Sequence, residues 1–268
     1  MTLGSHEPPP AGAPPHLPHL SGPEGMAALA QLMAAQALFA FDFDGTLAPI
    51  RPRPSDVHVS TPIATRLDKL ARHRPVAIVT GRSIADVRER LGFAPTWIVG
   101  NHGAEDDGDP GAADAAARAL DGLRLRLHEN GPALVAAGVV IEDKQQSLAL
   151  HYRTASDRAA ASRLVQSLLA DFRETLHVFG GKLVWNAVAH GAPDKAVAVR
   201  RLLMRVGGDR AFFAGDDVND EPVFAAAAPG WVTVRIGCER RDSAARFCID
   251  GPHEMAGVLD RMLALVGG

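Results

Sequence analysis

Short apolar runs alternate with amphipathic segments over most of the chain. The apolar runs have the length of buried strands, and they lie at 37–43, 75–80, 96–99, 211–214, 231–236 and 246–249. Segments with apolar residues at helical spacing lie between or beside them, at 26–36, 61–72, 83–91, 194–206 and 221–227. This alternation predicts an α/β fold, a doubly wound parallel sheet with a Rossmann-like core.

The middle of the chain departs from that alternation. Helical patterns cover 113–136 and 156–174, and each is followed by two strand-like runs, at 139–144, 147–153, 175–179 and 182–189. Residues 113–190 are therefore expected to form an αββαββ domain of the α+β class. It is inserted into a core domain made of 26–112 and 191–268.

The N-terminal region has its own composition. Residues 1–25 are dense in Pro and Gly and lack apolar periodicity, so we expect a disordered Pro-rich tail. The apolar stretch 26–43 has no basic segment before it, is interrupted by Gln31 and Gln36, and is short for a membrane span. It is interpreted as a helix followed by a buried strand.

Composition excludes several classes of protein. The net charge of −3, with 10 Phe, 3 Trp and 1 Tyr in 268 residues, provides neither a basic face nor stacking rings for nucleic acid. Cys238 and Cys248 match no metal-binding spacing and are too few for a disulfide framework. We expect both cysteines to be packing residues and the protein to be cytoplasmic. We also expect a monomer with no nucleic-acid or membrane partner.

The first group with chemical potential follows the apolar run 37–43. Asp42 and Asp44 are two residues apart, so their carboxylates can face one cleft, and Gly45 permits a sharp turn. In open α/β sheets, ligands bind outside the carboxyl ends of the strands. An Asp-Gly turn that merely closes a strand is the alternative, but it leaves the paired like charges unexplained.

A second acidic group follows the strand 211–214. Its four carboxylates within six residues repel one another unless they bind a cation or cap a helix, and they belong to Asp216, Asp217, Asp220 and Glu221. Asp220 or Glu221 can cap the next helix, whereas Asp216 lies directly at the strand end. Together with Asp42, Asp216 gives an oxygen-rich, incomplete ligand set suited to Mg²⁺.

Two further positions suit a phosphate group. Thr80 ends the strand 75–80 just before Gly81-Arg82, so its hydroxyl can point to the same edge of the sheet. Lys195 opens a helix, where a cation opposes the helix dipole and therefore indicates an anionic partner. The alternatives are a plain strand end at Thr80, a solvated Arg82 and a surface pair between Asp194 and Lys195.

These residues resemble, in order, the four motifs of the haloacid-dehalogenase-like phosphatases. The matching strings are Asp42-x-Asp44-Gly45-Thr46, Thr80, Lys195 and Gly215-Asp216-x-x-Asn219-Asp220. The resemblance implies an Mg²⁺-dependent phosphatase, because the second aspartate, Asp44, favours that activity over dehalogenation. It also implies that Asp42, Asp44 and Asp216 hold the metal, with Asp217, Asn219 and Asp220 around it.

A narrower resemblance, to the trehalose-6-phosphate phosphatases, covers about residues 37–250. Its strings include Thr80-Gly-Arg82, Gly100-Asn-His102-Gly103-Ala-Glu105, Glu142-Asp-Lys144, His151-Tyr-Arg153 and Gly181-Lys182. In that family the inserted domain is a cap over the sugar, which implies that Glu142 and Lys144 grip trehalose hydroxyls. Arg82, His102, Lys182 and Asn186 are expected to make further substrate contacts. Hinges are expected at 106–111 and 191–193.

The implied reaction is two-step phosphoryl transfer. Asp42 attacks phosphorus, Asp44 acts as general acid and then base, and Thr80, Lys195 and Mg²⁺ offset the charge on the phosphoryl group. Three functions stay open: a phosphatase for trehalose 6-phosphate, a phosphatase for another phosphorylated disaccharide or glycoside, and a non-catalytic phosphosugar sensor. The second is motivated by Asn186, which stands where this family often has a Glu.

Overall fold

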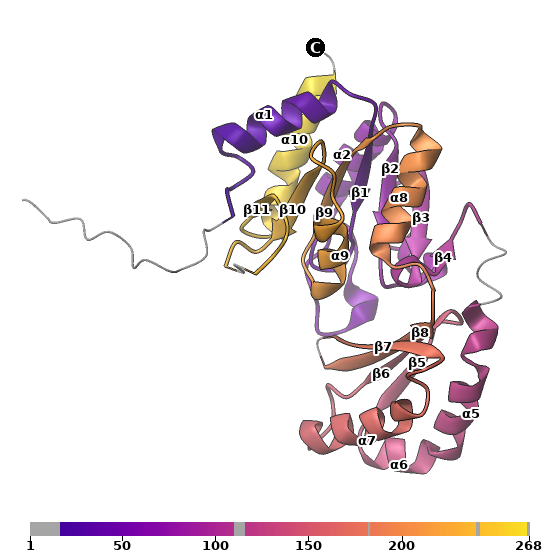
Figure 1. Ribbon diagram of the computed structural model, residues 1–268. Helices are drawn as coiled ribbons and strands as arrows, with labels where there is room; N and C mark the ends of the chain where they lie inside the picture. Colours follow the sequence, from indigo (N-terminus) through magenta and orange to yellow (C-terminus); the bar gives the residue numbers. More distant parts are fainter. Residues whose placement is uncertain (1–16, 110–115, 182, 240–241, 267–268) are drawn as a thin grey trace, which may run out of the picture.

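The computed structural model describes residues 17–109, 116–181, 183–239 and 242–266 (Figure 1). Within them, a seven-stranded sheet has the order β11-β10-β9-β1-β2-β3-β4. Its strands are β1 (Ala37–Phe41), β2 (Val76–Val79), β3 (Trp97–Gly100), β4 (Glu105–Asp106), β9 (Arg210–Gly215), β10 (Val232–Ile236) and β11 (Phe247–Ile249). All neighbours are parallel except β3 and β4. The predicted parallel α/β core is confirmed.

Helices cover both faces of this sheet (Figure 1). One face packs against α1 (Pro23–Met33), α2 (Thr61–Ala71), α3 (Ile84–Arg88) and α10 (Met255–Val266). The other face packs against α8 (Lys195–Val206) and α9 (Glu221–Ala225). Because β1 is buried along its whole length between these layers, its sequence ALFAF is apolar at every position.

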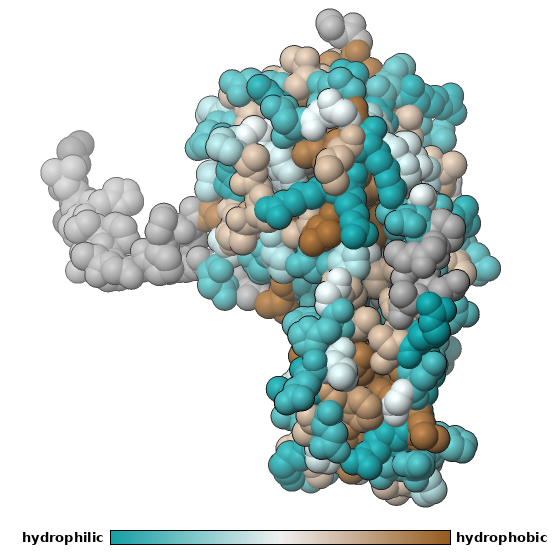
Figure 2. All heavy atoms as spheres, turned by 45° about the vertical axis from the view of Figure 1, so that its right-hand side comes forward, coloured by the Kyte–Doolittle hydropathy of each residue, from teal (hydrophilic) through white to brown (hydrophobic). Residues whose placement is uncertain are grey.

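A second, four-stranded antiparallel sheet forms the inserted domain, here called the cap. Its order is β5-β6-β8-β7, with β5 (Val140–Asp143), β6 (Ser147–His151), β7 (Leu176–Gly181) and β8 (Val184–Ala189). Its helices α5 (Asp121–Glu129), α6 (Gly131–Ala136) and α7 (Arg158–Ala170) lie on the side of the sheet away from the core (Figure 1). The other side of the sheet therefore faces the strand ends of the core, and in the space-filling view the cap is a narrower lobe below the core (Figure 2).

The structure corrects the expectation for the N-terminal tail in part. Residues 1–16 lie outside the described residues, but residues 17–25 are structured: α1 begins at Pro23, and Leu20 is buried. His19 forms a parallel bridge to Cys248, and main-chain hydrogen bonds join Leu20 N–H to Cys248 O and Cys248 N–H to Pro18 O. These bonds need no apolar periodicity, which is why the pattern did not reveal them.

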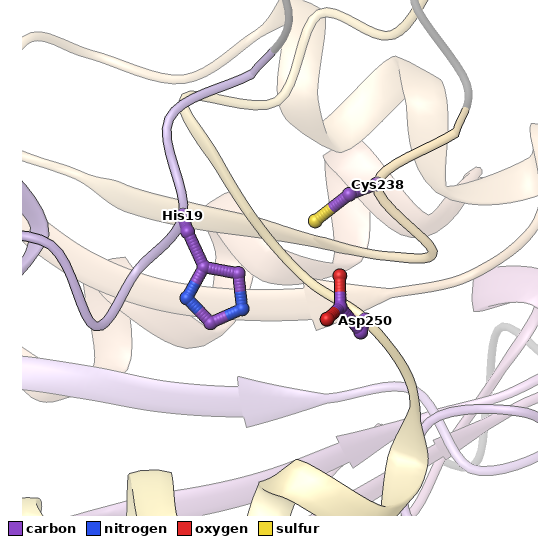
Figure 3. A group of neighbouring side chains, drawn as sticks. All are labelled: His19, Cys238 and Asp250. Atoms are coloured by element: carbon purple, nitrogen blue, oxygen red, sulfur yellow. The ribbon is translucent and has the colours of Figure 1, made fainter. Parts of the chain in front are cut away.

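The expectation for the two cysteines was wrong. Cys238 and Cys248 form a disulfide across ten residues of chain. The disulfide ties the loop after β10 to β11, and Figure 3 shows His19 and Asp250 beside Cys238. Cysteine usage therefore no longer supports a reducing compartment for this protein.

The described residues also include four short 3₁₀ helices: η1 (Pro54–Asp56), η2 (Asn101–Gly103), η3 (Val218–Asp220) and η4 (Pro252–Glu254). Of these, η2 follows β3 directly and η3 follows β9 after Asp216 and Asp217, at the strand ends that face the cap. Among the described residues, no helix is both long and apolar enough to cross a membrane.

Candidate active site

The carboxyl ends of three central strands meet below the cap. Asp42 follows β1, Thr80 follows β2, and Asp216 follows β9. A cleft of about 400 Å³ opens there and is lined by both the core and the cap. The strand order β9-β1-β2 places β1 in the middle, so Asp42 lies at the centre of the group.

A buried lysine joins the two acidic groups that the sequence pointed to. Lys195 Nζ donates to Asp42 Oδ1 over 2.7 Å and to Asp220 Oδ1 over 2.8 Å. Burial by itself disfavours the ammonium, but the carboxylates of Asp220 and Asp42 raise the pKa of Lys195, so it stays charged. Burial raises the pKa of Asp42 well above its usual value, Asp220 and Asp216 add to the rise, and Lys195 opposes it.

Gly45 lets the two acidic loops approach each other. Its φ of 84° is left-handed, and any side chain at this position would collide with the carboxylate of Asp216. Burial, followed by repulsion from Asp220, raises the pKa of Asp216 to about 7.

The donor set at this point fits a divalent cation. Carboxylate oxygens of Asp42, Asp216 and Asp220 lie within 4.8 Å of one another. Asp220 is already engaged, because its Oδ1 accepts from Lys195 and its Oδ2 accepts from Asp217 N–H. Asp42 also accepts from Lys195, but Asp42 and Asp216 lie directly at the ends of the neighbouring strands β1 and β9, and they are the carboxylates expected to hold Mg²⁺, a hard cation that prefers such oxygens.

Asp44 lies at the same cleft but faces a different partner. Arg82 donates to both of its oxygens, from Nε to Oδ2 and from Nη2 to Oδ1, each over 2.7 Å. Arg82 also donates from Nη1 to Asp86 Oδ2 over 2.7 Å, and its guanidinium lies over the ring of Phe43. Arg82, which the sequence predicts as a substrate contact, thus binds both oxygens of the Asp44 carboxylate in this structure.

Main-chain hydrogen bonds join the loop that follows β2 to the loop that follows β3. Thr80 is buried, and its Oγ1 accepts from Arg82 N–H over 3.2 Å while its carbonyl accepts from His102 N–H. The His102 ring meets Phe179 of the cap edge-on, with 5.3 Å between the ring centres. Burial, with Lys195 and Lys144 nearby, lowers the pKa of His102 well below its usual value, so the ring is neutral.

The loop after β9 is ordered by its own side chains. Asp217 and Asp220 form a reciprocal capping box on η3, and Asn219 Nδ2 lies 3.4 Å from Asp217 Oδ2. A buried arginine, Arg235 from β10, donates to Asp217 O over 3.1 Å and to Glu221 Oε1 over 3.2 Å. This loop is therefore fixed next to Asp216.

The cap contributes the opposite wall of the cleft. Glu142 Oε2 is 2.9 Å from His151 Nε2 and 3.7 Å from Lys144 Nζ, and the hydrogen bond from His151 lowers the pKa of Glu142. Asn186 is buried in β8 and lines the cleft. Lys182, the remaining predicted contact, lies outside the described residues.

Several residues at the cleft were not predicted. Thr46 Oγ1 donates to Asp42 Oδ2 over 3.3 Å, and Asp86 holds Arg82 and Arg90. Arg235 stands alone in an apolar strand, VTVRI, with every residue buried, and a charge in that setting is the signal that would have revealed it. Thr46 belongs to the motif string that begins at Asp42, although no contact was predicted for it, whereas Asp86 carries no comparable signal because it is an ordinary residue in the first turn of a helix.

A second group of metal-capable side chains lies far from the cleft, where His19, Cys238 and Asp250 approach one another (Figure 3). The Cys238 sulfur is committed to the disulfide with Cys248, and His19 Nε2 lies 3.1 Å from Glu254 Oε2. We assign no metal to this group.

Comparison with known proteins agrees with this geometry. The profile of the trehalose-phosphatase family matches residues 40–248, which is most of the chain. The chain belongs to the trehalose-phosphatase family. It is 31% identical over 243 residues to trehalose-phosphate phosphatase of Mycobacterium tuberculosis, covering 86% of this chain and 62% of that protein. The chain thus spans less than two thirds of the length of that relative.

Solved structures agree on the fold. The C-terminal domain of trehalose-6-phosphate phosphatase from C. albicans superposes with a TM-score of 0.75 at 22% identity, covering 96% of this chain and 99% of that one. A haloacid dehalogenase-like hydrolase from B. subtilis superposes with a TM-score of 0.56 at 18% identity, covering 84% and 98%. The capped α/β architecture is thus shared well beyond recognisable sequence similarity.

Proposed function

We propose that this protein is a trehalose-6-phosphate phosphatase that acts through an aspartyl-phosphate on Asp42. The observation that carries the proposal is the buried group of Asp42, Lys195 and Asp220, which places one carboxylate beside a fixed cation at the centre of the cleft. Membership of the trehalose-phosphatase family supports the substrate.

In the first step, an Asp42 oxygen bonds to phosphorus as the bond between phosphorus and the sugar oxygen breaks. Asp44 gives its proton to the leaving oxygen, for which it must turn away from Arg82, because that side chain occupies both of its oxygens. In the second step, Asp44 takes a proton from water, the water oxygen attacks phosphorus, and Asp42 is released together with phosphate.

The remaining core residues stabilise charge. Lys195 offsets the negative charge that grows on the phosphoryl oxygens, and the buried Thr80 hydroxyl is proposed to donate to the same group. Mg²⁺ bound by the side chains of Asp42 and Asp216 and by the carbonyl of Asp44 would add charge neutralisation. Asp217, Asn219 and Asp220 are proposed to order the surroundings of that ion and of Lys195.

The cap is proposed to select the sugar. Glu142 and Lys144 offer an acceptor and a donor for hydroxyl groups on the wall opposite Asp42. Asn186 offers an amide where a carboxylate is common in the family, and this specific difference keeps a phosphatase for another phosphorylated disaccharide as the second candidate.

The test is phosphate release from a panel of sugar phosphates with Mg²⁺, with Asp42→Asn as the inactive reference. We expect trehalose 6-phosphate to have the highest kcat/KM, and no release by the reference variant. Faster turnover of a monosaccharide phosphate would overturn the substrate assignment. Tight binding of trehalose 6-phosphate by the wild-type protein without turnover would instead favour the sensor.

Two further expectations remain predictions. Light scattering of the full chain tests the expectation that the protein is a monomer. A cytoplasmic location has lost its support from cysteine usage, and it is tested by locating the tagged protein in fractionated cells.

A further inference from the structure

A polar side chain of the core, Asn101, is fully buried at the boundary with the cap. It belongs to η2, directly after β3, and has a φ of 49°, a left-handed conformation that Asn tolerates better than most residues. Its backbone N–H donates to Arg82 O over 2.8 Å, and the next residue, His102, donates to Thr80 O. The main chain of this loop is therefore tied to the loop after β2, which contains Thr80 and Arg82.

The Asn101 side chain reaches the turn between β5 and β6 of the cap. Its Nδ2 lies 2.9 Å from Gln146 Oε1 and 3.2 Å from Lys144 O, and its Oδ1 accepts from Ser147 Oγ over 3.0 Å. The same Nδ2 also lies 3.0 Å from Glu105 Oε2 of the core, so its two hydrogens are shared among three acceptors, two of them in the cap. Gln146 and Ser147 are buried as well. A buried amide that bonds to the core through Glu105 and to the cap through Gln146, Lys144 and Ser147 fixes the two domains in one register.

Other contacts place this junction beside residues 191–193, which the sequence predicts to be a hinge. Gly103, two residues after Asn101, packs so closely on the linker that leads back to the core that an added Cβ would lie 2.6 Å from both Pro193 O and Asp194 O. Ser147 pairs with Val188, near the end of β8 that enters the same linker. The junction thus lies beside 191–193, the segment that the sequence predicts as a hinge, and a contact at a hinge can persist while the rest of a domain moves.

The same turn carries the residues proposed to hold the sugar. Lys144 is in the turn and donates from Nζ to Gly81 O over 3.0 Å, and Glu142 precedes it by two residues on β5. A shift of this turn moves both side chains relative to Asp42.

We propose that Asn101 is a positioning residue that seats the β5–β6 turn on the core and thereby sets where Glu142 and Lys144 meet the substrate. The proposal rests on the proposed function for its link to trehalose 6-phosphate. Its structural half, the seating of the turn, stands on the hydrogen bonds alone.

Asn101→Gly is the sharpest variant, because Gly keeps the left-handed backbone and removes only the amide. With two or three cross-domain hydrogen bonds lost, we expect KM for trehalose 6-phosphate to rise about 10-fold or more. Turnover of p-nitrophenyl phosphate, which is too small to need the cap, should stay within about twofold. Gln146→Ala should reproduce the effect, and the double variant should add little to either single variant.

Hydrogen exchange separates this proposal from the proposed function. In Asn101→Gly, amides of residues 144–147 should exchange faster than in the wild type, while those of β1 and β9 should not change. The matched control is Gln166→Ala, which removes an amide that bonds to Ser162 within α7. That control should change neither exchange at the turn nor KM.

Unchanged exchange at 144–147 in Asn101→Gly would overturn the seating role. Equal losses on the sugar phosphate and the aryl phosphate would overturn the positioning role, since they would indicate damage to the core. A wild-type protein inactive on trehalose 6-phosphate would defeat the proposed function, while the exchange result would still decide the seating.

Discussion

The two ends of the cleft are built in opposite ways. At the core end, Asp42, Lys195 and Asp220 are buried and joined by hydrogen bonds of 2.7 and 2.8 Å. At the cap end, Glu142 has a side chain that is 51% exposed and lies 3.7 Å from Lys144. The core end is preorganised before any substrate arrives, whereas at the cap end the Glu142 carboxylate is open to solvent although Lys144 is only 15% exposed.

This difference suggests a division of labour. On the proposed mechanism, fixed charges at the core end would stabilise a phosphoryl group whatever alcohol it is attached to, because they need no reorganisation during the reaction. The exposed Glu142 carboxylate contributes little to stability through its ion pairs and is free to exchange them for sugar hydroxyls. Changes at the core should therefore affect all substrates, and changes at the cap should affect only the large ones.

The largest effect is expected from Asp42→Asn. An amide cannot form the aspartyl-phosphate, so phosphate release should fall on the order of 10³-fold or more for both trehalose 6-phosphate and p-nitrophenyl phosphate. Steady-state phosphate release measures this, with exposed Asp56→Asn as the control, which should keep wild-type rates. Residual activity near wild type would rule out Asp42 as the nucleophile.

Asp216→Asn should come next, with a loss on the order of 10²-fold on both substrates because one ligand of the proposed Mg²⁺ site is removed. Without metal, the pKa of Asp216 is about 7 in the folded state and 3.8 in the unfolded chain. Between these two pH values, the folded state therefore binds a proton at Asp216 that the unfolded state does not. The stability of the metal-free protein should therefore decrease as pH rises from about 4 to 7.

Thermal unfolding in a chelator at several pH values tests this sign. Asp216→Asn should reduce the pH dependence but not abolish it, because the pKa of Asp42 is raised as well, and Mg²⁺ at pH 8 should raise the Tm of the wild type but not of the variant. Equal stabilisation of both proteins by Mg²⁺ would place the ion elsewhere.

Asn186→Glu should have a smaller effect, confined to large substrates. It restores the carboxylate common in the family on the wall of the cleft, and one additional charge-assisted hydrogen bond would lower KM for trehalose 6-phosphate about 3- to 10-fold. Asn186→Gln is the matched neutral variant and should lack the gain. If Asn186→Glu instead lowers kcat/KM equally for trehalose 6-phosphate and for p-nitrophenyl phosphate, Asn186 does not face the sugar.

Cys238→Ser should leave turnover of both substrates within about twofold while lowering stability. In the chain-entropy account, a disulfide that closes a ten-residue loop contributes about 2–3 kcal/mol. Denaturant unfolding measures the loss, and a thiol reductant should give the wild type the same loss and leave the variant unchanged. A large loss of activity in Cys238→Ser would show that this region communicates with the cleft.

The features that could be predicted from the sequence are those that depend on a few neighbouring residues. The order of strands and helices follows from apolar runs, and Asp42 and Asp216 follow from carboxylates placed directly at strand ends. Both deductions need only a few neighbouring residues, so the parallel core and the convergence of these carboxylates could be predicted without the structure.

Contacts between distant segments could not be predicted. The bond from Asn101 to Gln146 depends on how the cap sits on the core, and no periodicity encodes that placement. The clamp of Arg82 on Asp44 likewise depends on where two loops meet in space. The disulfide and the ordered residues 17–25 depend on main-chain pairing beside β11, which leaves no apolar pattern.

The most direct test of the division between core and cap is the ratio of kcat/KM for trehalose 6-phosphate to that for p-nitrophenyl phosphate in Glu142→Ala. Exposed Glu129→Ala, on α5 of the same domain, is the matched control. The division predicts that the ratio falls about 10-fold or more in Glu142→Ala, with aryl phosphate turnover within about twofold of wild type and no change in the control. An unchanged ratio, or an equal loss on both substrates, would contradict it.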